Sequence, residues 1–72
     1  MLSSEQVLDD YYPQVRAWLI QIGAVLDRYD RAGGGLDADQ RLRRYHQSLQ
    51  ILASADGDRA EQIQRLFSDP VE

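Results

Sequence analysis

The sequence predicts an all-α fold: a helical hairpin with a kinked first helix and a short third helix, as in a three- to four-helix bundle. The chain has 72 residues, enough for one small domain. Apolar residues recur at alternating spacings of four and three over residues 8–29, which is typical of an amphipathic helix. No stretch alternates between apolar and polar residues with period two, so no strand is expected. We expect a single helical domain over residues 1–72, with helices at about 4–10, 11–32, 37–55 and 59–68.

The first long helix carries an apolar stripe with an unbroken spacing of four and three residues. Its members are Leu8, Tyr12, Val15, Leu19, Ile22, Leu26 and Tyr29. Four apolar residues beside the stripe widen the apolar face to roughly 140°; they are Val7, Tyr11, Trp18 and Val25. We expect this face to form the core. Because one helix cannot cover so wide a face, the third helix or a second copy of the chain must shelter the rest.

Capping residues and a proline predict where the first helices begin. Ser3 and Gln6 have the spacing of a capping box, in which each side chain bonds the backbone N–H of the other residue. Pro13 lies inside the apolar pattern, where it removes a backbone hydrogen bond and crowds the carbonyl four residues earlier. We therefore expect a kink or a short break at residues 9–13, with Asp10 capping a new helix.

The second and third helices are each predicted to begin at an aspartate. Asp37 has Gln40 three residues later, and Asp58 has Glu61, so both pairs fit a capping box. Gly57 is expected to end the second helix. The connection between the two long helices is only about four residues long, so these helices are expected to be antiparallel neighbours.

The two shorter helices carry narrower apolar stripes than the first. The stripe of the second helix consists of Leu42, Tyr45, Leu49, Leu52 and Ala53. The stripe of the third consists of Ala60, Ile63, Leu66 and Phe67. The third helix is expected to stop before Pro70 and to fold back over the open side of the hairpin.

Three consecutive glycines, Gly33 to Gly35, follow the first long helix. A phosphate-binding loop would need backbone donors at a helix N-terminus, usually after a strand and close to a lysine. The chain contains no lysine, and Asp37 and Asp39 would repel an anion. We interpret the glycines as a turn, because glycine readily takes the positive φ that a helix C-terminus requires.

Five arginines gather on either side of this turn: Arg28, Arg31, Arg41, Arg43 and Arg44. Three of them follow an aspartate by four residues, the spacing of an intrahelical ion pair; these pairs are Asp27–Arg31, Asp37–Arg41 and Asp39–Arg43. We interpret the cluster as a solvated, salt-bridged end of the hairpin. The alternative is a nucleic-acid-binding regulator that contacts phosphates through Arg41, Arg43 and Arg44.

Metal, cofactor and catalytic chemistry have little support in the sequence. His46 is the sole histidine and there is no cysteine, so a zinc site would depend on carboxylates. The stretch around Gly57 lacks the alternating aspartates of a calcium-binding loop. The serines have no histidine and acid placed to activate them. We therefore expect no metal, no cofactor, no small-molecule substrate and no enzymatic activity.

A short aromatic segment, Tyr11, Tyr12 and Pro13, follows two aspartates. It resembles the Tyr-Tyr-Pro segment through which the DNase-colicin immunity proteins, small acidic four-helix inhibitors, contact their toxin. In that family the segment comes later in the chain, after two helices. The resemblance implies a second alternative, an acidic inhibitor of the immunity type. The simpler interpretation is that both rings pack, with their hydroxyls in water.

Three residues point to a partner helix. Ile20 lies on the polar side of the first helix, Ile51 lies away from the stripe of the second, and Gly23 costs the first helix ~1 kcal/mol relative to alanine. A glycine at such a position commonly allows another backbone to approach closely. We expect a symmetric homodimer in which two hairpins form a four-helix core, with an interface that includes Tyr11, Tyr12, Ile20, Gly23 and Ile51.

Composition indicates more about the source and location of the protein than about its function. The net charge is −4, and all eight bases are arginine, which suggests a GC-rich bacterial genome. The first residues lack the basic start and apolar run of a secretory signal, so we expect none, and no apolar run reaches the ~20 residues that cross a membrane. We expect a cytoplasmic, non-enzymatic protein-interaction module that binds itself and can also bind another protein.

Overall fold

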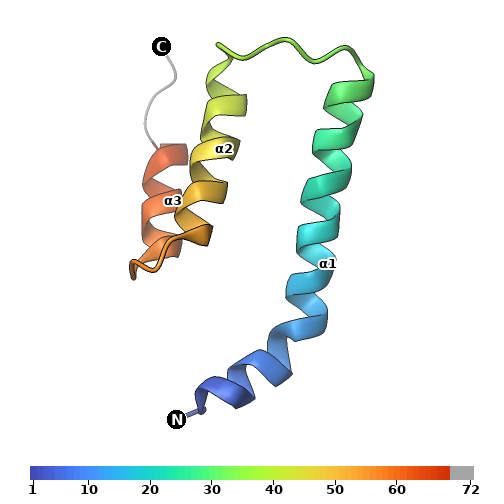
Figure 1. Ribbon diagram of the computed structural model, residues 1–72. Coiled ribbons are helices and arrows are strands. Elements are labelled where there is room, and N and C mark those ends of the chain that lie inside the picture. The colour runs from blue at the N-terminus through green and yellow to red at the C-terminus, as the bar shows by residue number, and fades with distance from the viewer. Residues whose placement is uncertain (69–72) are drawn as a thin grey trace. The chain divides into compact units, whose positions relative to one another are not determined.

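The computed structural model describes residues 1–68, which form three α-helices and no strand (Figure 1). The helices are α1 (Ser4–Arg31), α2 (Gln40–Ala53) and α3 (Arg59–Ser68). The chain divides into two compact units, Met1–Gly34 with α1 and Gly35–Glu72 with α2 and α3. The predicted all-α class is therefore confirmed. Pro70, which was expected to stop the third helix, lies outside the described residues.

Helix α1 begins at the predicted capping box. The Ser3 hydroxyl accepts a hydrogen bond from the Gln6 backbone N–H at 3.1 Å, and the Ser3 N–H donates to the Gln6 side-chain oxygen at 2.9 Å. These two bonds satisfy backbone donors that a helix start leaves without intrahelical partners.

Helix α1 continues through Pro13, so the predicted division into helices at 4–10 and 11–32 is wrong. Asp10 consequently lies inside the helix and is not a cap. A proline within a helix removes one hydrogen bond and displaces the preceding turn, which bends the helix without necessarily ending it. Figure 1 shows such a bend in the N-terminal, blue part of α1. The kink is present, but the residues on both sides of it remain helical.

The three glycines end α1 as predicted, through a Schellman motif. The Gly34 N–H donates to the Tyr29 carbonyl at 3.1 Å, and the Gly33 N–H donates to the Asp30 carbonyl at 3.0 Å. Gly33, Gly34 and Gly35 have φ values of 118°, 55° and 80°. Side chains strongly disfavour these backbone angles, so the backbone conformation alone accounts for glycine at these positions.

Helix α2 begins three residues later than predicted, and its cap is Asp39 in place of Asp37. The Asp39 carboxylate accepts a hydrogen bond from the Arg41 backbone N–H at 2.8 Å. The Asp39 N–H donates to the Leu36 carbonyl at 2.9 Å, which closes a turn over residues 36–39. Asp37 is part of this turn, so it cannot take the position from which a cap bonds the first helical N–H groups.

Helices α2 and α3 pack against each other within the second unit (Figure 1). The turn that joins them is held by the Arg59 guanidinium, which donates two hydrogen bonds to the Ser54 carbonyl at 3.0 and 2.6 Å. Asp58 has a φ of 60°, whereas a capping residue is normally extended. The Glu61 carboxylate accepts from Arg65 at 2.7 Å. The predicted Asp58–Glu61 capping box is therefore replaced by other contacts.

Burial in the second unit is concentrated on α2. Leu42 is 8% exposed and is the one buried apolar side chain of the described chain. Leu49 on α2 and both Ile63 and Leu66 on α3 are half-buried. The stripes predicted for the two shorter helices therefore supply this small core.

Helix α1, which is the only helix of the first unit, leaves most of its apolar stripe exposed. Val15, Leu19 and Ile22 are exposed, and Leu26 is half-buried. The first unit contains a single helix, and a lone helix cannot shelter its own side chains. The apolar face is present on α1, and its burial in the core of a bundle stays a prediction.

Candidate interaction surface

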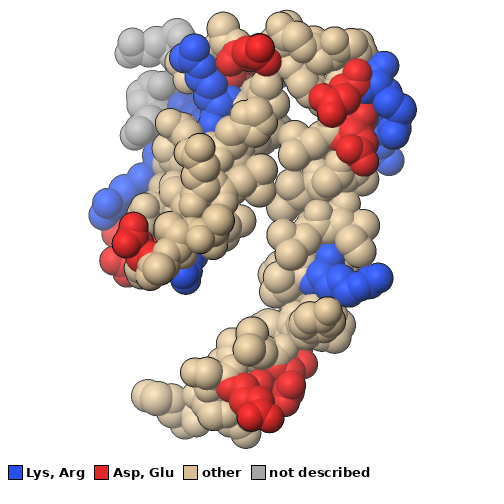
Figure 2. All heavy atoms as spheres, in the orientation of Figure 1, with Lys and Arg blue, Asp and Glu red and all other residues tan. Residues whose placement is uncertain are grey.

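The most extensive feature of the described chain is an exposed apolar surface on α1. Ten large apolar side chains of this helix are 39–69% exposed. We call them the α1 surface; they are Val7, Leu8, Tyr11, Tyr12, Val15, Trp18, Leu19, Ile20, Ile22 and Val25. Figure 2 shows charged groups near both ends of α1 and a basic group partway along it, with uncharged stretches on either side of that group.

The size of the α1 surface exceeds what monomeric proteins normally expose. Whole residues of these types, from valine to tryptophan, expose roughly 150–250 Å² each when free, with the aromatic ones at the upper end. With about half of each residue exposed, the ten together present about 1000 Å², against the few hundred Å² of apolar patch found on a typical monomer. A stable interface buries about 800 Å² on each partner. The α1 surface is therefore large enough for a specific interface.

The second unit offers a smaller apolar surface. In its part up to Ser68, large apolar side chains are exposed at Leu36, Tyr45, Leu52 and Phe67. With about half of each residue exposed and the same area per free residue, these four expose about 400 Å². This area is less than half of that on α1, so the second unit does not have enough exposed apolar surface to cover the α1 surface alone.

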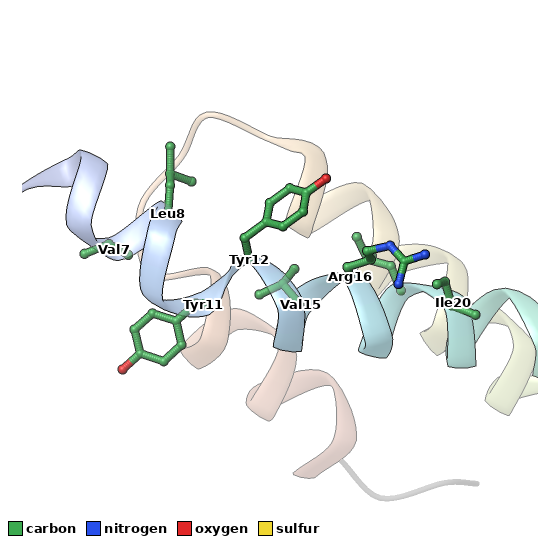
Figure 3. A pocket seen from close by; sticks show the side chains of 8 residues that line it. Val7, Leu8, Tyr11, Tyr12, Val15, Arg16 and Ile20 are labelled. Atoms are coloured by element: carbon green, nitrogen blue, oxygen red, sulfur yellow. The ribbon is translucent and has the colours of Figure 1, made fainter.

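An open hollow lies on the N-terminal half of the α1 surface (Figure 3). Residues four apart on a helix form ridges, and the groove between two such ridges accepts side chains of a packing helix. One ridge of the hollow consists of Val7, Tyr11, Val15 and Leu19. The other consists of Leu8, Tyr12, Arg16 and Ile20. Arg16 is the one charged residue that lines it.

The two tyrosines of the predicted interface lie on different ridges of this hollow. Tyr11 is 49% exposed and Tyr12 is 68% exposed, and their rings point to different sides of α1 (Figure 3). The interpretation that both rings pack within the chain is therefore not supported. Asp9 and Asp10, which precede them, are also exposed.

The other predicted interface residues fall in different places. Ile20 is 54% exposed and extends the Leu8 ridge, and a Cβ added at Gly23 would meet nothing within 4 Å. Both positions are thus accessible on α1. Ile51 is half-buried and lines a small hollow together with Gln62 and Leu66 of α3. Its apolar side chain is explained by the neighbouring helix of the same unit, so no second copy is needed at this position.

Sequence reasoning placed Val15, Leu19 and Ile22 in the core, and therefore left them out of the candidate interface. The signal that could have found them is the unbroken spacing of four and three residues. This spacing identifies an apolar face, although it does not say which partner covers that face.

One member of the arginine cluster, Arg41, has a partner within the chain that the sequence did not predict. Arg41 forms a two-point contact with Asp39, with N–O distances of 3.0 and 2.8 Å. The sequence predicted Asp37 as its partner and Arg43 as the partner of Asp39. Arg43 is exposed and Arg44 is half-buried. A nucleic-acid surface needs several cations that are available to phosphates, and the Arg41–Asp39 contact removes one of the three candidates.

The Arg41 contact also changes the acidity of the capping aspartate. Hydrogen bonds from the Arg41 side chain and backbone N–H lower the pKa of Asp39 from 3.8 to about 2. The carboxylate consequently stays ionised, and remains a cap for α2, well below the pH at which an ordinary aspartate is protonated.

The residues considered for metal binding do not form a site. Among residues 1–68, no group of three or more His, Cys, Asp or Glu side chains lies close enough together to hold a metal ion. His46 is exposed on α2. Asp58 and Glu61 are accounted for by the turn and by the Arg65 ion pair.

Comparisons with known proteins add no family to these observations. The chain matches no protein-family model, and no curated protein or solved structure shows significant similarity to it. Within the described residues, no helix combines the length and the apolar character needed to cross a membrane.

Proposed function

We propose that this chain is a non-enzymatic protein-interaction module that acts as a homodimer through the α1 surface. The observation that carries the proposal is the difference between about 1000 Å² of exposed apolar side chain on α1 and about 400 Å² on the second unit. Two copies that pair through α1 would bury between about 1200 and 2000 Å² in total, depending on how much of the α1 surface the second unit covers, and this is the range of a stable specific interface.

We further propose that each copy closes into a helical hairpin within the dimer. Eight residues connect Arg31 to Gln40, and a connection this short favours antiparallel neighbouring helices. The exposed apolar side chains of the second unit would then cover one flank of the α1 surface, and the α1 stripe itself would face the second copy. Such a pair of hairpins has a four-helix core and could present its remaining exposed groups to another protein.

The test is sedimentation equilibrium of the full chain over a wide range of concentrations. The monomer has a mass of 8.3 kDa, and the expected species at micromolar concentration has twice that mass. Trp18 is the sole tryptophan and is 49% exposed in one chain, so its emission should move to shorter wavelength as the dimer forms. A monomer at millimolar concentration, with unchanged Trp18 emission, would overturn the proposal.

A second candidate function is inhibition of another protein, as in the immunity proteins. The observation in its favour is that Tyr11 and Tyr12 are exposed together beside Asp9 and Asp10, so this segment presents two rings and two carboxylates. A basic partner would fit that chemistry. Protection of DNA from a DNase-type toxin, lost in Tyr11→Ala and Tyr12→Ala, would support this candidate.

Nucleic-acid binding is the weaker alternative. Exposed Arg43 supports it, whereas the contact between Arg41 and Asp39 counts against it. A gel-shift assay with RNA and DNA at low salt tests the alternative. We expect the mobility of RNA and DNA to stay unchanged at protein concentrations below the one at which the protein dimerises. A shift in mobility that Arg43→Ala abolishes would favour the nucleic-acid role.

A further inference from the structure

We infer that the two copies of α1 lie antiparallel in the dimer, in a register centred near Trp18. The inference rests on the proposed homodimer and specifies how its α1 surfaces meet. Three properties of α1 lead to it: the distribution of charge along the helix, the repeat of the apolar stripe, and the length over which apolar side chains are exposed.

Charge is distributed unevenly along α1. Glu5, Asp9 and Asp10 are exposed near its start, and no base occurs before Arg16. A parallel pair would bring these acids beside their own copies, so six carboxylates would gather at one end. It would also align like ends of the two helix dipoles.

The opposite end of α1 can accept these acids. Residues 27–31 carry two aspartates and two arginines, so their net charge is zero. Arg28 and Arg31 are both exposed. In an antiparallel pair, each acidic end lies beside this neutral end of the partner, and like charges are separated by the length of the helix.

The apolar stripe also fits an antiparallel copy of itself. When Leu8 is level with the partner's Leu26, Tyr12 is level with the partner's Ile22, and Val15 with the partner's Leu19. Six of the seven stripe residues then have an apolar residue of the partner at their own level.

The apolar side chains that flank the stripe fit the same register. They meet their counterparts across the twofold axis, with Tyr11 close to the partner's Val25 and Trp18 close to the partner's Trp18. Because this flank is apolar on both copies, pairing it removes aromatic surface from water on both sides.

A second antiparallel register, displaced by one heptad, also matches six stripe residues. It sets Val15 level with the partner's Leu26, and it leaves residues 4–9 beyond the end of the partner's helix. Leu8 is 69% exposed and lies in that segment, as does Val7. The register centred near Trp18 overlaps almost the whole of α1 and covers these side chains, so we favour it.

Cysteine cross-linking tests orientation and register, because the chain has no cysteine of its own. Leu8→Cys and Leu26→Cys are prepared separately, oxidised alone and as an equal mixture, and analysed without reductant. The inference predicts a covalent dimer in the mixture only. Disulfide formation by each variant alone indicates a parallel pair, and a cross-link between Val15→Cys and Leu26→Cys indicates the displaced register; either result overturns the inference. Ala24→Cys, on the polar side of α1, is the control and should not cross-link with Leu8→Cys.

A second measurement leaves the apolar surface intact. Spin labels are attached at Ala17→Cys or at Arg28→Cys, both on the polar side of α1, and the distance between the two copies is measured. Position 17 lies at the centre of the register, so the two labels at position 17 are level with each other. The two labels at position 28 are separated along the helix axis by the length of 22 residues, or about 33 Å. The distance should therefore be longer at position 28 by more than about 10 Å. Equal distances would overturn the antiparallel arrangement.

Sedimentation of the same samples tests the homodimer separately from its antiparallel orientation. A monomer refutes the proposed homodimer and this inference together. A dimer that cross-links in a parallel arrangement keeps the proposed function and refutes the inference alone.

Discussion

Replacing Leu19 by alanine tests whether the α1 surface is the dimer interface. Leu19→Ala removes three carbons, and a buried CH₂ group contributes about 0.8 kcal/mol. Because Leu19 is 55% exposed in a single chain, about half of this contribution arises only on association. The expected loss is about 1.3 kcal/mol per copy and about 2.6 kcal/mol per dimer. Since 1.4 kcal/mol corresponds to a factor of ten, the dissociation constant should rise about 50- to 100-fold.

The chain offers a closely matched control for this experiment. Leu36 is also a leucine that is 55% exposed, but it lies in the connection after the glycine turn. Leu36→Ala should change the dissociation constant of the dimer by less than about threefold. Sedimentation equilibrium of both variants measures the difference directly. Equal effects of the two substitutions would refute the reasoning, because the α1 surface would then have no special part in association.

Three further predictions concern local features of the two units. Gly33→Ala should lower the free energy of unfolding in urea by about 1–2 kcal/mol, because Gly33 has a φ of 118°. Gly57→Ala, where an added Cβ meets nothing within 4 Å, is its control and should change the free energy by less than about 0.5 kcal/mol. Asp39 should titrate with a pKa of about 2 in carboxyl NMR, so its stabilising contribution is complete above its ordinary value of 3.8 and is lost as the pH falls toward 2. Arg41→Ala should return this pKa toward 3.8, and an unchanged pKa would contradict the assigned cause. Gly23→Ala should raise the thermal stability of α1 by up to ~1 kcal/mol, since the added methyl group has open space; a lower melting temperature would indicate a close neighbour at Gly23.

Local signals in the sequence predicted the ends of α1 well. The capping box of Ser3 depends on residues three apart, and the glycine turn depends on hydrogen bonds that span at most five residues. Interactions this short are decided by the residues that make them, so the sequence contains most of the information needed.

The start of α2 was harder to predict because two aspartates are chemically equivalent as caps. Asp37 and Asp39 differ in the backbone that precedes them, and the hydrogen bond from Asp39 to the Leu36 carbonyl decides between them. Asp58 shows the same difficulty, because its positive φ excludes the extended geometry of a usual cap. Capping propensity identifies the residue type, but the turn selects the position.

Pro13 shows that a substantial local penalty need not end a helix. The residues on both sides of it carry one continuous apolar pattern, and the helix accommodates the ring by bending. The same pattern explains why the candidate surface was only partly predicted. Tyr11, Tyr12 and Ile20 were expected at an interface, whereas Leu19 was assigned to the core. Periodicity shows that a face is apolar, but it does not identify what shelters that face.

The consecutive left-handed glycines have a practical consequence for chemical protein synthesis. A positive φ that L-residues avoid is one that their mirror images readily adopt, so D-alanine at Gly33 or Gly35 should be tolerated better than L-alanine. A D-residue there would restrict the unfolded chain while leaving the native junction unchanged, which favours folding. A chain of 72 residues is accessible to peptide ligation, so handedness at this junction becomes a means of adjusting stability without altering any side chain of α1.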